Sequence, residues 1–281
     1  MPDFNDVRLK RPEGVGIGFQ VTAGVAAIRE TPAPDGRLGT QALHGEMLDV
    51  FREEGEFGLC QLRRDRYVGW VNMDALSAPA LPVTHKVSAL RTYCFAEPDL
   101  KSAPRFMLCL GARVAATGRA EGPWLDCDRA GWIHRRHLAA LTAFETDPAG
   151  VAERYLETPY LWGGRESLGL DCSGLIQQAF EACGVMLPRD SDMQAAWAGE
   201  AVADWRAPGR LQRGDLVFWR GHVGILTAPD RLLHANAFHL AAACEPLGEA
   251  IERIRTVEGE VTCVRRVSLA PGGTPDWLKA D

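Results

Sequence analysis

The chain has 281 residues, of which 46% are hydrophobic and 24% charged, and its formal net charge is −6. This composition is typical of a globular protein, and the length allows two or three domains with separate cores. A negative net charge gives no electrostatic reason to expect nucleic acid or an anionic membrane as a partner.

Neither a secretion signal nor a membrane segment is evident. Six charged side chains lie among the first twenty residues, and no apolar run of secretory length is found there. No later stretch approaches the roughly 18 uninterrupted apolar residues of a membrane helix. The eight cysteines lack the spacing of a disulfide framework. We therefore expect reduced thiols and a cytoplasmic location.

Residues 1–20 are expected to form an irregular lead-in that ends in a glycine-rich stretch. Residues 21–78 then show short apolar runs separated by Gly, Pro and Asp, at positions 25–28, 46–51, 58–62 and 67–71. Short strands with frequent turn residues predict a small all-β barrel.

Residues 83–141 repeat the pattern of residues 21–78. Three features recur at an offset of 62 residues, namely Ile28-Arg29 and Leu90-Arg91, Gly69-Trp70 and Gly131-Trp132, and Leu76 and Leu138. Such agreement indicates an internal duplication, with residues 77–82 as the linker. Each copy is close to the lower size limit for an independent core, so we expect it to pack against the rest of the chain.

A third domain is predicted over residues 146–281, and its main feature is a cysteine at the start of a helix. Apolar residues recur at helical spacing after Cys172, Gly184 is a natural helix end, and Asp171 can serve as the N-cap. A thiol near free helix N–H groups is expected to have a lowered pKa. Taken alone, a buried cysteine that only packs is the commoner case.

Two histidines favour a catalytic role for Cys172 over a packing role. Residues 216–219 and 222–226 form a predicted hairpin around Arg220-Gly221, and a third strand follows at residues 231–235. Antiparallel pairing would place His222 and His234 side by side, facing the helix of Cys172. This arrangement suits a thiolate nucleophile, a histidine base and a third group that orients the base. One Cys and two His could instead hold zinc, but the chain lacks both the helix-borne Glu signature and paired cysteines, so no metal or cofactor is expected.

Five motifs in order over the last 135 residues or so resemble the NlpC/P60 cysteine peptidases. They are Tyr160-Leu161-Trp162-Gly163-Gly164, Asp171-Cys172-Ser173-Gly174-Leu175-Ile176, Leu187-Pro188-Arg189-Asp190-Ser191, Gly214-Asp215-Leu216-Val217-Phe218 and His222-Val223-Gly224-Ile225. The duplicated segment resembles bacterial SH3-like domains. The whole chain is similar to the γ-D-glutamyl-L-diamino acid endopeptidases that process murein peptides. The resemblance implies an α+β fold, with a papain-like NlpC/P60 catalytic domain preceded by two small all-β SH3-like barrels that pack on it.

By this resemblance Cys172 is the nucleophile, His222 the general base and His234 the orienting residue. The remaining site residues that it implies bind substrate: Tyr160, Asp171, Ser173, Arg189, Asp190 and Ser191 in the last domain, and Tyr67 and Glu46 in the first barrel. Asp171 and Ser173 would meet the free amine of L-alanine, while the residues from Arg189 to Ser191 would hold the α-carboxylate of γ-D-glutamate. Tyr67 and Glu46 would form a wall that blocks longer N-terminal extensions.

The substrates implied are small released peptides such as L-Ala-γ-D-Glu-diamino acid, which places the enzyme in murein peptide recycling in the cytoplasm. Two other enzymatic activities stay open: an amidase or acyltransferase acting on a different acyl donor, and a cell-wall hydrolase acting on intact murein. The alternative to an enzyme is a peptide- or glycan-binding module, which would require an inert Cys172.

Overall fold

A computed structural model of the chain describes residues 6–270, 275 and 278. These residues form two compact units that meet in sequence between Ala143 and Phe144. The first unit is all-β, and the second combines helices with a sheet, so the fold is α+β as predicted. Among the described residues, no helix has the length and apolar character that crossing a membrane requires.

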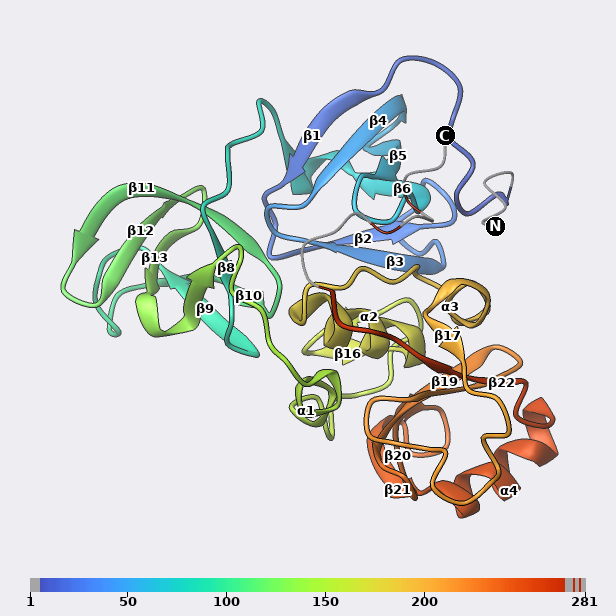
Figure 1. Cartoon of the computed structure of the whole chain (residues 1–281). Coiled ribbons are helices and arrows are strands. Elements are labelled where there is room, and N and C mark those ends of the chain that lie inside the picture. Colours follow the sequence, from blue (N-terminus) through green and yellow to red (C-terminus); the bar gives the residue numbers. More distant parts are fainter. Residues whose placement is uncertain (1–5, 271–274, 276–277, 279–281) are drawn as a thin grey trace. The chain divides into compact units, whose positions relative to one another are not determined.

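The first unit begins with a seven-stranded antiparallel sheet of order β3-β2-β6-β5-β4-β1-β7 (Figure 1). Its elements are β1 (Ile17–Val21), β2 (Val25–Arg29), β3 (Leu38–Leu43), β4 (Met47–Glu54), β5 (Phe57–Leu62), β6 (Val68–Asn72), the 3₁₀ turn η1 (Met73–Ala75) and β7 (Leu76–Ser77). Alternate residues of β2 are buried, and Ala26 and Ile28 enter the barrel core with Leu48 and Val71.

A second seven-stranded sheet follows in the same unit, with the order β10-β9-β13-β12-β11-β8-β14. Its elements are β8 (His85–Val87), β9 (Arg91–Phe95), β10 (Pro104–Cys109), β11 (Arg113–Glu121), β12 (Trp124–Asp128), β13 (Gly131–His134), η2 (Arg135–His137) and β14 (Leu138–Ala140). Adding seven to each strand number of the first sheet reproduces this order. Gly45 and Gly111 occupy the same turn of each barrel with φ of 80° and 89°. The predicted duplication is therefore visible in the strand topology.

The two barrels contact each other within their unit. The backbone N–H of Arg113 donates to the carbonyl of His44 at 2.8 Å, and Arg129 donates to the carbonyl of Pro79 in the linker at 2.6 Å. Leu43 of the first barrel also packs into the core of the second. These contacts enlarge a core that each copy could barely build alone.

The expectation of an irregular lead-in over residues 1–20 is wrong for its last part, while residues 1–5 lie outside the described residues. Ile17–Val21 form β1, which pairs with β4. Gly16, just before this strand, approaches β4 closely, because a Cβ there would lie 2.9 Å from the Cβ of Asp49. Frequent glycine was interpreted as a loop signal, whereas here it permits close cross-strand contacts.

The second unit combines a six-stranded antiparallel sheet, of order β17-β22-β18-β19-β20-β21, with four described helices. The strands of this sheet are β17 (Glu200–Ala201), β18 (Leu216–Trp219), β19 (His222–Ala228), β20 (Arg231–Asn236), β21 (Ala241–Pro246) and β22 (Cys263–Arg266). Two short strands, β15 (Arg165–Glu166) and β16 (Gly169–Leu170), pair with each other in a separate sheet. The helices of the unit are α1 (Pro148–Glu153), α2 (Cys172–Ala182), α3 (Ser191–Trp197) and α4 (Leu247–Glu258). Helix α2 packs against β19 and β20, while α4 packs against β20 and β21 (Figure 1).

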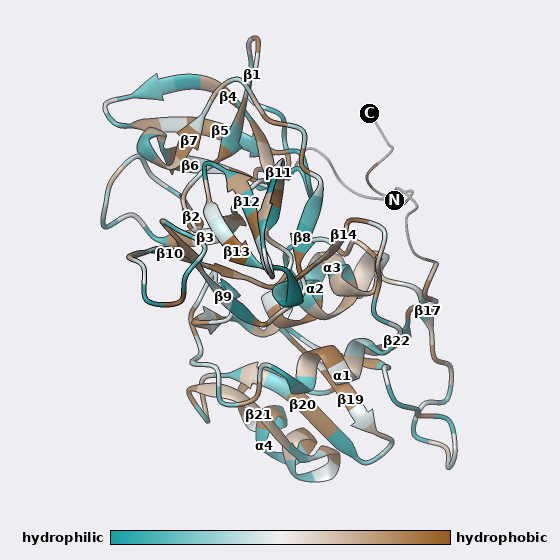
Figure 2. Ribbon diagram, turned by 90° about the vertical axis from the view of Figure 1, so that its left-hand side faces the viewer, coloured by the Kyte–Doolittle hydropathy of each residue, from teal (hydrophilic) through white to brown (hydrophobic). Residues whose placement is uncertain are grey.

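The hydropathy of these elements explains the packing. Figure 2 shows apolar colour along β19 and β20, in the interior of the sheet, and mixed colour along α4. Helix α4 buries Leu247, Ala250 and Ile254 on one side and exposes charged residues on the other. The predicted hairpin is present, since Trp219 pairs with His222 around a turn in which Gly221 has φ of 77°. His222 thus begins β19, and β20 carries His234 as predicted.

Candidate active site

Cys172 is the first residue of α2, as predicted, and its side chain is buried. Asp171 is the N-cap, and its Oδ1 accepts the backbone N–H of Gly174 at 2.7 Å. The start of β19 lies beside this helix end, since α2 packs against β19 and the backbone N–H of Val223 is close enough to Cys172 to lower the pKa of its thiol. The predicted nucleophile therefore lies next to the strand residue that follows His222.

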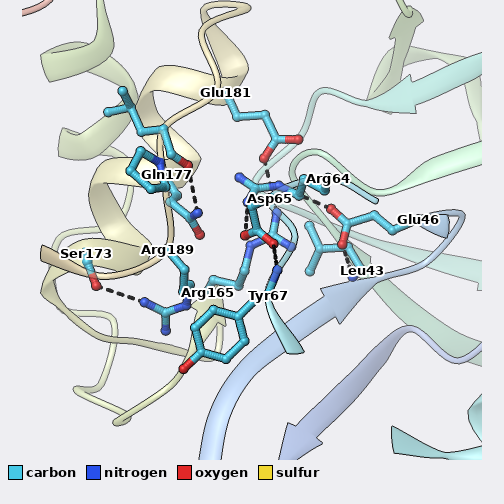
Figure 3. Close-up of polar contacts among 12 residues, drawn as sticks. Leu43, Glu46, Arg64, Asp65, Tyr67, Arg165, Ser173, Gln177, Glu181 and Arg189 are labelled. Atoms are coloured by element: carbon cyan, nitrogen blue, oxygen red, sulfur yellow. Dashed lines mark hydrogen bonds and ion pairs between the residues drawn. The ribbon is translucent and has the colours of Figure 1, made fainter. Parts of the chain in front are cut away.

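A buried polar cluster holds the start of α2. Arg189 donates to Asp171 Oδ1 at 3.0 Å and to Asp171 Oδ2 at 2.7 Å. It also donates to Ser173 Oγ at 2.8 Å (Figure 3). Asp171 also accepts from the backbone N–H of Gly163 at 2.8 Å and from Ser173 Oγ at 3.2 Å. Charge-assisted hydrogen bonds of this kind orient the first turn of the helix firmly.

The predicted low pKa of the Cys172 thiol is wrong for this structure. Burial and the neighbouring Asp171 carboxylate raise its pKa to about 12, although the N–H groups of Val223 and Ser173 and the Arg189 guanidinium oppose the shift. Burial destabilises the thiolate form of Cys172 by more than the helix N-terminus stabilises it. Cys172 is thus a neutral thiol at rest, and a nucleophile made from it needs a base.

The two predicted histidines are in contact. His222 Nε2 lies 2.7 Å from His234 Nδ1, and the ring centroids are 5.0 Å apart. Burial, with the nearby His234 and Arg253, lowers the pKa of His222 to about 3, so its imidazole is neutral at pH 7. Burial also lowers the pKa of His234. A neutral imidazole is the form that can accept a proton.

Sequence reasoning missed Glu245 and Arg253. Glu245 Oε1 lies 2.6 Å from His234 Nε2, and the same oxygen accepts a hydrogen bond from Arg253. Glu245 lies on β21 and Arg253 on α4. A lone glutamate within the largely apolar stretch Ala241–Pro246 was the available signal, but only strand pairing shows that it faces His234.

His234, His239 and Glu245 also bring three possible metal-ligand atoms within 4.8 Å of one another. His234 Nε2 and Glu245 Oε1 are bonded to each other at 2.6 Å, and His239 Nδ1 contacts Asn236 Oδ1 at 3.0 Å. The set contains no cysteine, so it differs from the Cys and two His considered for zinc.

The other predicted residues of this unit lie around the start of α2. Burial and the nearby Cys172 and Asp171 side chains raise the pKa of Tyr160, so its hydroxyl stays protonated and can donate. Asp190 is the N-cap residue of α3, and Ser191 is its buried first residue. Contact of these side chains with a substrate stays a prediction.

Tyr67 and Glu46 lie in the first barrel and are described within it. Glu46 Oε2 accepts the backbone N–H of Leu43 at 2.9 Å, and its other oxygen lies 3.6 Å from Arg64 (Figure 3). The backbone N–H of Tyr67 donates to Asp65 at 3.2 Å, and the ring packs in the barrel core. Both side chains therefore have structural partners in the barrel, and their part in a substrate site stays a prediction.

Comparison with known families agrees with this arrangement. Residues 157–257 match the NlpC/P60 family, and residues 28–76 match the bacterial dipeptidyl-peptidase SH3 domain. The second unit thus contains an NlpC/P60 domain, and the first unit contains a bacterial dipeptidyl-peptidase SH3 domain.

Individual relatives give finer comparisons. The chain is 27% identical over 239 residues to "Dipeptidyl-peptidase 6" of Lysinibacillus sphaericus, covering 77% of this chain and 86% of the relative. It is 35% identical over 133 residues to "Gamma-D-glutamyl-L-lysine dipeptidyl-peptidase" of Bacillus subtilis, covering 42% of this chain and 41% of the relative. An NlpC/P60 family protein of Bacillus cereus has the same fold, with a TM-score of 0.73, 18% identity and coverage of 90% of this chain and 100% of that one.

Proposed function

We propose that the protein is a cysteine peptidase that hydrolyses the γ-D-glutamyl–diamino acid bond of murein peptides with a free N-terminal L-alanine. The observation that carries the proposal is the set of Cys172, His222 and His234, with a thiol at a helix start beside a strand that begins with one of two bonded imidazoles. The name of the Bacillus subtilis relative supports the γ-D-glutamyl substrate class, and the name of the Lysinibacillus relative supports a peptidase.

The reaction follows from the neutral state of both groups. As Cys172 Sγ attacks the γ-carbonyl carbon, its proton moves to His222 and a tetrahedral intermediate forms. His222 then gives that proton to the departing amine as the C–N bond breaks, which leaves a thioester on Cys172. Water, deprotonated by His222, attacks the thioester, and the returning proton restores the Cys172 thiol. The backbone N–H of Cys172 has no intrahelical acceptor at the helix start and would donate to the oxyanion.

The polar cluster at the start of α2 would recognise the charged ends of the substrate. Asp171 and Ser173 are proposed to meet the L-alanine amine, and the residues from Arg189 to Ser191 the α-carboxylate. Arg189 and Asp171 already satisfy each other, so each would have to share its bonds with the ligand. In this proposal Tyr67 and Glu46 of the first barrel limit the length of the N-terminal side.

A requirement for a free alanine amine would exclude stem peptides still attached to glycan. The enzyme would then act on released peptides, which fits the proposed role in recycling in the cytoplasm.

The test is a comparison of substrates by liquid chromatography and mass spectrometry. We expect cleavage of L-Ala-γ-D-Glu-L-Lys and of its diaminopimelate analogue to L-Ala-D-Glu and the free diamino acid, and little cleavage after N-acetylation of the alanine. Cys172→Ser should abolish turnover, whereas Cys263→Ser on β22 serves as the matched control and should retain it.

Other outcomes would replace the proposal. Hydrolysis of intact sacculi as fast as of free tripeptide would make the protein a wall hydrolase. Reaction only with simple amides or with acyl acceptors other than water would indicate an amidase or acyltransferase. A Cys172 that no alkylating agent modifies at neutral pH would favour a binding module.

A further inference from the structure

The side chains behind His234 form a chain of hydrogen bonds that begins at Arg253. Glu245 accepts from Arg253 and contacts His234 Nε2 at 2.6 Å, and His234 Nδ1 contacts His222 Nε2 at 2.7 Å. The Glu245 side chain is 13% exposed and that of His234 is fully buried. All four residues belong to the second unit and come from β19, β20, β21 and α4.

Strand register explains why Glu245 faces His234. His234 pairs with Ala243 across β20 and β21, and Glu245 lies two residues further along β21. Residues two apart on a strand share a face, so Glu245 is the diagonal neighbour of His234. Arg253, one and a half turns into α4, closes over the same carboxylate oxygen.

The charge state of Glu245 fixes the direction of these bonds. Burial alone would raise the pKa of Glu245, but the hydrogen bonds from His234 and Arg253 outweigh it and lower the pKa to about 2. An ionised carboxylate can only accept, so His234 carries its proton on Nε2. Since His234 is neutral, its Nδ1 carries a lone pair and can only accept. His222 must therefore donate to it from Nε2.

The proton positions then decide which nitrogen of His222 is available. With its proton on Nε2, neutral His222 has its lone pair on Nδ1, the one ring nitrogen that His234 does not occupy. We propose that Glu245, held by Arg253, is a positioning residue that fixes the tautomers of His234 and His222 so that His222 Nδ1 accepts the Cys172 proton. The role rests on the proposed cysteine peptidase function, in which His222 is the base.

Nitrogen-15 NMR of histidine-labelled full-length protein tests the proton positions directly. In the wild-type protein at pH 7 we expect neutral His222 and His234, both protonated on Nε2. Protonation of either ring on Nδ1 instead would overturn the proposal, whether or not any variant folds.

Variants test the consequence for the thiol. Glu245→Leu should leave His234 free to take either tautomer and should lower the rate of Cys172 alkylation by iodoacetamide about 10- to 100-fold. Glu245→Gln should keep the wild-type tautomers and most of the rate, because its amide oxygen can accept from both His234 and Arg253. Glu252→Leu on the exposed side of α4 is the control and should behave as wild type. Alkylation of a Cys172→Ala protein measures the background from the other cysteines.

Alkylation needs no peptide substrate, so it separates the two proposals. If Glu245→Leu slows alkylation and mixes the tautomers while no murein peptide is cleaved, Glu245 keeps its positioning role and the proposed function fails. If Glu245→Leu retains both wild-type tautomers and an alkylation rate within about twofold, the positioning role is wrong.

Discussion

At the scale of single residues, the Cys172 thiol and the His222 imidazole are both neutral at rest. Burial raises the pKa of Cys172 to about 12 and lowers that of His222 to about 3, because both charged forms lose hydration. A thiolate–imidazolium pair is therefore disfavoured at rest. Proton transfer has to accompany attack on the substrate, which makes the orientation of His222 decisive.

The Asp171–Arg189 pair is expected to contribute strongly to stability. Arg189→Met would leave the Asp171 carboxylate buried without its two guanidinium bonds, and breaking a buried ion pair on one side costs about 3–5 kcal/mol. Denaturant unfolding should show a loss of this size, monitored by tryptophan fluorescence.

The double variant Asp171→Asn/Arg189→Met tests whether the loss of stability comes from the unpaired Asp171 charge. Asparagine keeps an oxygen for the N-cap and carries no charge, so the double variant should recover part of the loss. A loss below about 1 kcal/mol in Arg189→Met would mean that the pair is effectively solvated.

At the scale of elements, the position of Cys172 depends on how closely α2 approaches the loop before it. A Cβ on Gly174 would lie 2.2 Å from the backbone carbonyl oxygen of Gly164. Backbone atoms cannot move aside as a flexible side chain can. The first turn of α2 therefore needs glycine at this position.

Gly174→Ala should displace the helix start and destabilise the protein by about 1–3 kcal/mol, with slower alkylation of Cys172. Gly248→Ala on α4 is the matched control, because its Cβ would meet no atom within 4 Å. Alanine there should be neutral or stabilise by up to about 1 kcal/mol. Equal thermal unfolding temperatures and alkylation rates for the two variants would show that α2 tolerates the methyl group.

At the scale of the whole molecule, the duplicated barrels and the NlpC/P60 unit are separately cored, and the buried histidines link stability to pH. His222 has a pKa of about 3 when folded and an ordinary value near 6.5 when unfolded. Between these values the unfolded chain binds a proton that the folded protein does not, so stability falls as the pH drops below 6.5. Glu245, with a folded pKa of about 2, adds a loss in the same direction below about pH 4.5.

His222 should contribute about 1.4 kcal/mol per pH unit below pH 6.5. His222→Gln should therefore reduce the slope of unfolding free energy against pH between 6.5 and 5 by about that amount, whatever its effect at pH 7. Urea unfolding at several pH values measures the slope. An unchanged slope would mean that His222 is protonated in the folded protein.

Local sequence patterns were sufficient to predict much of this molecule. Short apolar runs and turn signals predicted the strands and the hairpin, and the Asp171 cap predicted the start of α2. The 62-residue offset predicted the duplication that the two sheet orders show. These features depend on neighbours in sequence, where side-chain period and backbone preference act directly.

Tertiary structure alone decided the protonation and the full extent of the site. The pKa of Cys172 depends on how deeply α2 is buried, and the partner of His234 depends on the register of β20 with β21. Arg189 was predicted to bind a carboxylate, and the fold gives it Asp171 of its own chain. Burial and long-range charge arise only when distant segments meet, because desolvation and Coulomb energies depend on three-dimensional distance and not on sequence separation.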